Sequence, residues 1–342
     1  GFQVILKILA MREPMVAPEM VATLLEISKG CITLLDGTFR TQYSRELPQC
    51  ALDYLLALPS GELRRLSRRT WHSIVLAVKP YMIEAARHGG MTVGEKIETF
   101  QLDFALRHLE SPFLDQRIVG INDVKLFVTS ANENERYQRQ STSAGSFGFF
   151  TGVGAVGANA PPPSIRMWYD AKRLIGYIER KKLLEVLLNP SNTHLEIVRR
   201  SESFLRLLAD HEALRTEHLD LLWALASSEQ HESLEHLAYE ILNRLLPSLS
   251  LAHTSHLFSR IRDKPYDKYD TALVRFIREV TTSVFAKQAR NSKVSNWYGL
   301  SLLWDAIHPE SEKNLSSPLL TSRGITKGGA QGEGLGTTTK GV

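Results

Sequence analysis

Two cysteines and several histidines of this 342-residue chain have side chains that could act as nucleophiles, bases or metal ligands. A cysteine thiolate is a strong nucleophile when a nearby base or cation lowers its pKa. Cys31 and Cys50 are the two thiols of the chain, and each lies among apolar residues such as Ile32 and Leu52. Neither stands in a local sequence pattern of a thiol enzyme. We therefore interpret both as small, buried side chains and predict no catalytic residue.

Two pairs of histidines have spacings close to those of metal ligands. His231 and His236 are five positions apart, which turns the second imidazole about 140° away from the first on a helix. His253 and His256 share a helical face, but two ligands without a nearby cysteine or carboxylate make a weak site. We interpret these histidines as solvated or capping residues and predict no metal ligand. A helical enzyme that uses a metal ion held by His253 and His256 is kept as an alternative.

Glycines at positions 152, 154 and 157 match the spacing of the dinucleotide-binding fingerprint. That chemistry needs a strand before the glycines and a helix N-terminus after them, where free N–H groups hold the pyrophosphate. The preceding residues are rich in Ser, Gly and Phe, and three prolines follow at positions 161 to 163. We therefore interpret the pattern as part of a flexible segment and predict no bound cofactor.

Four arginines, at positions 64, 65, 68 and 69, form a basic patch on one predicted helical face. Such a patch could bind phosphate or an acidic partner. It lacks interleaved aromatic residues, and the net charge of the whole chain is only +4, from 41 basic and 37 acidic residues. We interpret the patch as an ordinary solvated face and predict no nucleic-acid partner.

The overall composition excludes several classes of protein. Hydrophobic residues make up 43% of the chain and charged residues 23%, which excludes a wholly disordered chain and collagen. The low cysteine content excludes a disulfide-stapled miniprotein and predicts a reducing, intracellular compartment. We expect the cytoplasm and leave the nucleus open as a second location. No apolar stretch reaches the roughly 18 residues that cross a bilayer, so we predict no membrane partner.

Amphipathic helices with short breaks must position any functional side chain, because they fill most of the chain. The segment 31–41 contains Asp36-Gly37, a signal for a β-hairpin, with a helix-connecting loop as the favoured alternative. Pro80 is expected to kink or restart its helix. The predicted helices span residues 18–28, 49–58, 62–78, 95–109, 114–129, 167–188, 232–246, 251–261, 269–284 and 294–307, with two more opened by Thr193 and Thr216.

Paired helices of this kind predict an all-α fold, an irregular armadillo- or HEAT-like α-solenoid of stacked helix pairs. Each pair has two apolar edges that it cannot bury alone, so neighbouring pairs complete the core. Residues 1–130 form a first helical-repeat segment, which we expect to be truncated because it begins inside an apolar run without Met. Residues 131–164 form a flexible Gly/Ser/Pro-rich insertion, residues 165–308 a second helical-repeat segment, and residues 309–342 a disordered Gly-rich tail.

Three passages of the sequence carry a family resemblance. They are residues 104–125, which end in Ile-Asn-Asp-Val-Lys, residues 168–200, and residues 204–209 together with 219–223 and His231-Glu232. In combination they resemble the helical-repeat region of very large ubiquitin-specific proteases of the fat-facets class. The resemblance covers about 200 residues, from about Leu102 to Ile307.

The resemblance implies a non-catalytic α-solenoid that belongs to a giant cysteine-type deubiquitinase. The family's catalytic Cys box and His box have no counterpart here, and Cys31 and Cys50 do not match the first of them. The implied function is a scaffold that positions protein substrates or adaptors for deubiquitination. The alternative is a free-standing helical-repeat adaptor without any protease domain, whose partners are likewise proteins.

Overall fold

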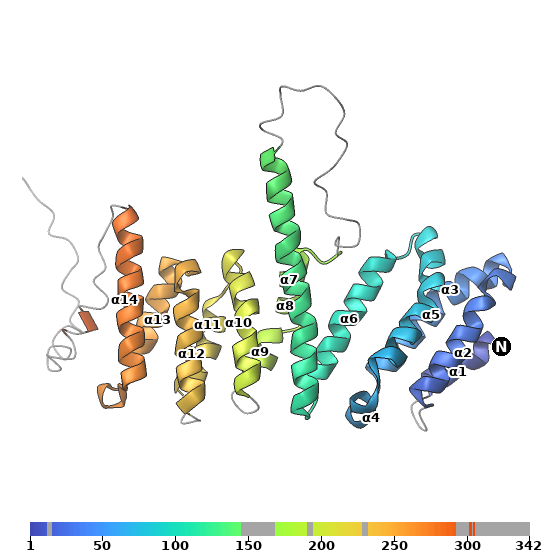
Figure 1. Ribbon diagram of the computed structural model, residues 1–342, viewed down its shortest axis with the longest axis horizontal. Helices are drawn as coiled ribbons and strands as arrows, with labels where there is room; N and C mark the ends of the chain where they lie inside the picture. Colours follow the sequence, from blue (N-terminus) through green and yellow to red (C-terminus); the bar gives the residue numbers. More distant parts are fainter. Residues whose placement is uncertain are drawn as a thin grey trace, which may run out of the picture. The chain divides into compact units, whose positions relative to one another are not determined.

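The computed structural model describes residues 1–11, 16–144, 168–189, 194–227, 232–291, 301, 302 and 304 (Figure 1). It divides into two units, Gly1–Val294 and Ser295–Val342. The three described residues of the second unit are helical, and all that follows concerns the first. No strand occurs in the described parts of the chain, so the predicted all-α class is confirmed.

Helices of very different length build the first unit. The extensive contacts join helices one to three places apart in chain order, such as α3 with α5, α6 with α7, and α11 with α12. This is the packing of an α-solenoid, in which each helix pair is completed by its neighbours. The helices are α1 (Phe2–Ala10), α2 (Pro18–Gly30), α3 (Gly37–Leu56), α4 (Ser60–Arg65), α5 (Arg68–Arg87), α6 (Val93–Leu109), α7 (Leu114–Ala144), α8 (Ala171–Arg180), α9 (Leu183–Leu187), α10 (Leu195–Asp210), α11 (Thr216–Ser227), α12 (Glu232–Leu245), α13 (Leu251–Asp263) and α14 (Thr271–Asn291).

The segment 31–41 is not a β-hairpin. It forms a short 3₁₀ turn, Ile32–Leu34, and then begins α3. The Asp36 carboxylate accepts hydrogen bonds from the backbone N–H groups of Thr38 and Phe39, so this residue caps the helix instead of turning a hairpin. Helix α3 then runs through Pro48, and α5 runs through Pro80 without a restart.

The predicted boundary of the insertion at residue 131 is wrong, because α7 continues to Ala144. Its buried stripe extends past that point at helical spacing, through Phe127, Ala131 and Asn134, and this packing holds the helix. The other part of the predicted insertion, residues 145–164, lies outside the described residues, as does the tail at 309–342.

The predicted helix 167–188 is two helices, α8 and α9. Asp170 caps α8 by accepting a hydrogen bond from the N–H of Arg173. Lys182 then adopts a left-handed conformation with φ of 51°, which ends the helical path and redirects the chain. The turn allows Leu183, Leu184 and Leu187 of α9 to be buried. Helix α10 is capped by His194, and Thr193, the predicted cap, lies outside the described residues.

Helices α6 and α7 approach each other closely at Gly120. A Cβ atom at this position would lie 2.5 Å from the carbonyl oxygen of Ala105 and 2.9 Å from the backbone nitrogen of Leu109. Any side chain would therefore push the two helices apart. Because α7 also packs against α8 and α10, this contact fixes the helix that connects the earlier repeats to the later ones.

Candidate protein-interaction surface

The two cysteines are free and half-buried. The Cys31 thiol donates a hydrogen bond to the carbonyl oxygen of Ile27 at 3.7 Å. Burial, and then the charges of Asp53 and Glu46, raise the pKa of Cys50. A raised pKa keeps the thiol protonated and therefore a poor nucleophile. Both thiols are thus less buried than the sequence predicts.

His256 belongs to an ionic cluster that joins α11 to α13. Its Nε2 lies 2.7 Å from Oδ1 of Asp220, and the Arg260 guanidinium donates to both oxygens of that carboxylate, at 2.8 and 3.0 Å. Burial opposes ionisation of Asp220, but hydrogen bonds from Arg260 and His256 hold its pKa below the usual value. The Asp220 carboxylate is thus engaged in holding two helices together.

The described residues do not form a metal site around the histidines. Within the described ranges, no group of three or more His, Cys, Asp or Glu side chains could hold a metal ion. His236 lies 3.4 Å from Glu232 of its own helix, and His231 lies outside the described residues. The alternative of a metalloenzyme built on His253 and His256 therefore gains no third ligand from these parts of the chain.

The four arginines of the predicted basic face do not share one helix. Helix α4 ends at Arg65 and helix α5 begins at Arg68. Between them, the Ser67 hydroxyl accepts a hydrogen bond from the backbone N–H of Thr70 and caps α5. Arg64 pairs with Asp115 at 3.0 Å and lies over the ring of Phe113. The cap therefore divides the arginines between α4 and α5, which corrects the prediction.

An aromatic groove runs between α5, α6 and α7. Two adjoining cavities, of about 390 and 150 Å³, share Arg68, Trp71, Phe104 and Asp123 in their walls. Exposed Val119 and Leu126 line its outer part. The groove therefore offers apolar surface with two positive side chains, Arg64 and Arg68, and two negative ones, Asp115 and Asp123, beside it.

Two buried polar side chains also line the aromatic groove. Neither Nδ1 of His108 nor Oε1 of Gln116 has a hydrogen-bond partner in the described part of the chain. Burial, and then the charge of Arg107, lower the pKa of His108 to about 4. His108 is therefore neutral at physiological pH, and its ring packs edge-on against Phe104.

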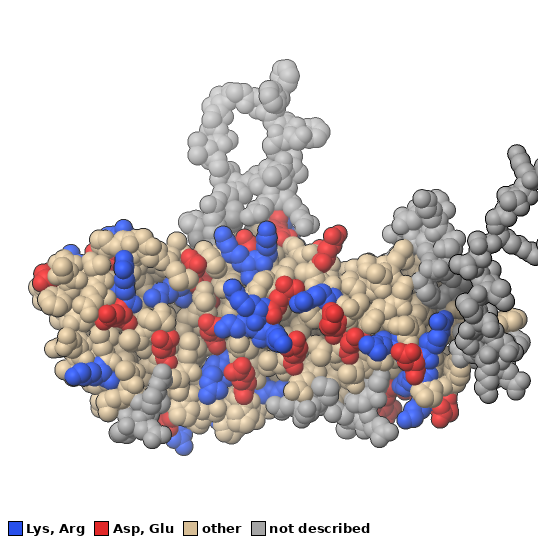
Figure 2. All heavy atoms as spheres, turned by 180° about the vertical axis from the view of Figure 1, so that it is seen from behind, with Lys and Arg blue, Asp and Glu red and all other residues tan. Residues whose placement is uncertain are grey.

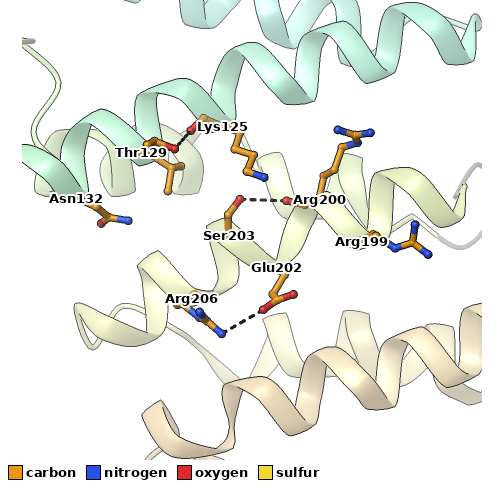
Figure 3. A pocket seen from close by; sticks show the side chains of 9 residues that line it. Lys125, Thr129, Asn132, Arg199, Arg200, Glu202, Ser203 and Arg206 are labelled. Atoms are coloured by element: carbon orange, nitrogen blue, oxygen red, sulfur yellow. Dashed lines mark hydrogen bonds and ion pairs between the residues drawn. The ribbon is translucent and has the colours of Figure 1, made fainter.

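A second groove lies on the other side of α7, against α10, and differs entirely in chemistry (Figure 3). We call it the basic groove. Its cavity has a volume of about 270 Å³ and is lined by Lys125, Val128, Thr129, Asn132, Arg199, Arg200, Glu202, Ser203 and Arg206.

Sequence reasoning missed the basic groove, although a signal for it exists. The lining residues of α7 are at positions 125, 128, 129 and 132, and those of α10 include 199, 202, 203 and 206. Both sets follow the i, i+3, i+4, i+7 spacing of one helical face. Which polar face meets which is decided by the packing of α7 against α10.

Ion pairs organise the basic groove. Glu196 pairs with Arg199 at 2.6 Å and with Arg200 at 3.1 Å, and Arg200 also donates to the side-chain oxygen of Asn122. Glu202 pairs with Arg206 at 3.2 Å and with Arg244 of α12 at 2.7 Å. Each arginine of α10 that lines the groove thus has a carboxylate beside it.

Stacked helix pairs with grooves between them define this protein as an α-solenoid of the helical-repeat class. The family model described as the UBP24/USP9X/USP9Y ARM repeat matches residues 95–317, so the chain belongs to this family. The matched residues include nearly all of α6 and the whole of α7 and α10, so the match covers helices that line both grooves. It confirms the resemblance carried by the passages between residues 104 and 232.

Similar curated proteins are large ubiquitin hydrolases. The chain is 22% identical to human ubiquitin carboxyl-terminal hydrolase 34 over 258 residues, which cover 72% of this chain. It is 22% identical to human ubiquitin carboxyl-terminal hydrolase 9Y over 164 residues, or 48% of this chain. The aligned part spans only about 6% of each relative. No solved structure matches the chain.

The described helices include none that is long and apolar enough to cross a membrane. The longest of them, α7, carries charged residues along much of its length, among them Asp123, Lys125 and Glu133.

Proposed function

We propose that this chain is a non-catalytic scaffold within a large cysteine-type deubiquitinase, where it positions substrates or adaptors for removal of ubiquitin. The observation that carries the proposal is the ARM-repeat match over residues 95–317. It is supported by two curated relatives that are ubiquitin carboxyl-terminal hydrolases many times longer than this chain. In the parent protein, a thiolate in another domain would attack the isopeptide bond.

The partners in this proposal are proteins, held on the surface of the solenoid, rather than nucleic acids or membranes. Stacked repeats create long surfaces that suit such binding, and the two grooves beside α7 provide chemically different contacts. We also propose a cytoplasmic location, with the nucleus as a second one. Microscopy of the tagged parent protein tests the location, and exclusive residence in a secretory compartment would contradict it.

The decisive experiment compares the parent protein with a variant from which the repeat segment, residues 95–317 of this chain, has been deleted. A small fluorogenic ubiquitin substrate requires only the catalytic domain, so we expect its hydrolysis to be unchanged. Release of ubiquitin from ubiquitinated cellular proteins should fall, because those substrates need the scaffold. Equal loss of both activities, or of neither, would contradict the proposal.

A cleavage assay on the present chain tests its non-catalytic character. We expect no turnover of the fluorogenic substrate. Turnover that is abolished by Cys31→Ala or by Cys50→Ala would instead make the chain a thiol enzyme.

A free-standing adaptor is the second candidate, because the extended surfaces of helical-repeat solenoids in general suit protein binding and need no protease domain for it. Extending the gene in both directions separates the two. A Cys/His protease domain in the same reading frame supports the scaffold, and a complete gene without one supports the adaptor.

A further inference from the structure

We propose that the basic groove between α7 and α10 binds an acidic peptide segment, whose side-chain carboxylates lie between Lys125 and the arginines of α10. The proposal rests on the proposed function in that it takes the partner to be a protein. It adds the chemistry of that partner and the place where it is held.

The charge of the groove favours an anionic ligand. Four cationic side chains line it, from Lys125, Arg199, Arg200 and Arg206, against the single carboxylate of Glu202. When the ion-pair partners Glu196, Glu240 and Arg244 are added, five cations still face three carboxylates. On the face of the molecule that Figure 2 shows, Lys and Arg gather near the middle with Asp and Glu among them.

Three of the four cations that line the groove, those of Lys125, Arg199 and Arg206, are exposed to a ligand. Lys125 is exposed and has no carboxylate within ion-pair distance among the described residues. The side chains of Arg199 and Arg206 are 54% and 53% exposed, and their pairs with Glu196 and Glu202 lie within one helix. Such exposed pairs are weak. A ligand carboxylate can therefore replace or join them at little cost.

The polar lining suits carboxylates in particular. Asn132 is exposed at the edge of the groove, and its side-chain amide supplies N–H donors. The cavity of about 270 Å³ accommodates one or two acidic side chains. The hydroxyls of Thr129 and Ser203 donate to the backbone oxygens of Lys125 and Arg200, so they leave the charged groups to meet the ligand (Figure 3).

The same lining disfavours single-stranded nucleic acid. Proteins that bind such strands combine positive charge with aromatic side chains on which the bases stack. Among the described residues that line the basic groove, none is aromatic. The groove therefore supplies charge without a stacking platform, which suits the extended backbone and carboxylates of an acidic peptide.

The test measures binding of a fluorescein-labelled ten-residue Glu/Gly peptide to the full 342-residue chain by fluorescence anisotropy. Matched probes are the same peptide with Gln in place of Glu and a ten-nucleotide single-stranded DNA. The variants Lys125→Glu and Arg199→Glu reverse one charge each in the groove. Lys79→Glu is the control, because Lys79 is exposed on α5 and lies outside the groove. Circular dichroism confirms that each variant is folded.

We expect the Glu peptide to bind and each groove variant to weaken it roughly 5- to 10-fold, while Lys79→Glu changes the affinity less than about 2-fold. Binding should also weaken as NaCl rises, because the contacts are solvent-exposed. The proposal is overturned if the Glu peptide does not bind, or if the Gln peptide binds equally well. It is also overturned if Lys125→Glu binds the Glu peptide as tightly as the wild type, or if the DNA binds more tightly than the Glu peptide.

The outcomes separate this proposal from the proposed function. Suppose that the parent protein needs the repeat segment for native substrates, but Lys125→Glu leaves the affinity for the peptide unchanged. In that case only the proposed acidic-peptide site is wrong. If the peptide binds as expected but deletion of the segment changes no activity, the site stands and the scaffold role fails.

Discussion

The two grooves beside α7 show how one helix presents opposite chemistry to its two neighbours. Toward α5 and α6 it contributes Val119, Asp123 and Leu126 to a groove walled by aromatic rings. Toward α10 it contributes Lys125, Thr129 and Asn132 to a groove rich in arginine. Successive side chains point in different directions around a helix. Residues of α7 that are only a few positions apart therefore line an apolar groove on one side and a cationic groove on the other.

The difference separates stability from binding. The aromatic groove adjoins fully packed side chains, so changes there disturb the fold through lost burial. The basic groove consists of exposed ion pairs that contribute little to stability. Substitutions in the first should therefore lower the free energy of unfolding, whereas those in the second should alter ligand binding and leave folding intact.

The largest effect is expected from Phe104→Ala. Phe104 is only 4% exposed and packs against Trp71, Phe100 and His108, with ring centroids 4.8 to 5.6 Å apart. Its removal leaves a cavity and should lower the free energy of unfolding by about 3–4 kcal/mol. Urea denaturation followed by circular dichroism measures this. A loss below about 1 kcal/mol would show that the aromatic wall is not part of the packed core.

Gly120→Ala tests the contact that fixes α7 between the grooves. The added Cβ would meet the Ala105 carbonyl at 2.5 Å, so we expect a loss of about 2–3 kcal/mol from overpacking. Gly176→Ala is the matched control, because a Cβ there meets nothing within 4 Å and Ala is the better helix former by about 0.5–1 kcal/mol. If both substitutions stabilise the protein, α6 and α7 are not in close contact.

The pH dependence of stability should depend on His108 in the aromatic groove. Its pKa is lowered to about 4 in the folded state by burial and by Arg107, against about 6.5 when unfolded. The unfolded state therefore binds more protons between these values, and stability falls as the pH drops from 7 to 5, by about 2 kcal/mol from this residue. Denaturation of the wild type and of His108→Leu at both pH values measures it. An unchanged difference between the two pH values in the variant would remove His108 as the cause.

The smallest effect is expected from Arg206→Ala in the basic groove. Arg206 pairs with Glu202 at an exposed position, and Glu202 retains its partner Arg244 after the change. The free energy of unfolding should therefore change by about 0.5 kcal/mol or less. A loss comparable to that of Phe104→Ala would abolish the distinction between the two grooves. Thermal and urea denaturation, run in parallel on both variants, make the comparison direct.

Much of the architecture follows from local patterns. The helical spacing of apolar residues predicts the all-α solenoid, and the passages between residues 104 and 232 indicate the family that the match over 95–317 establishes. Local hydrogen bonding was harder to predict. Asp36 caps α3 where a hairpin was possible, and Ser67 divides the arginine face, because short polar side chains compete for free backbone N–H groups at helix starts.

The sequence by itself determines which residues of each helix share a face, since that depends only on the helical period. Only the tertiary structure decides which faces meet. Lys125 and Arg199 lie in one groove, as do Asp220 and His256 in one ionic cluster, although each pair is far apart in the chain. It also decides that α7 continues past residue 131, where buried Ala131 and Asn134 extend its packing. The physical reason is that polar faces do not select one another. The close packing of the apolar stripes fixes which helices are neighbours, and thereby which polar faces meet.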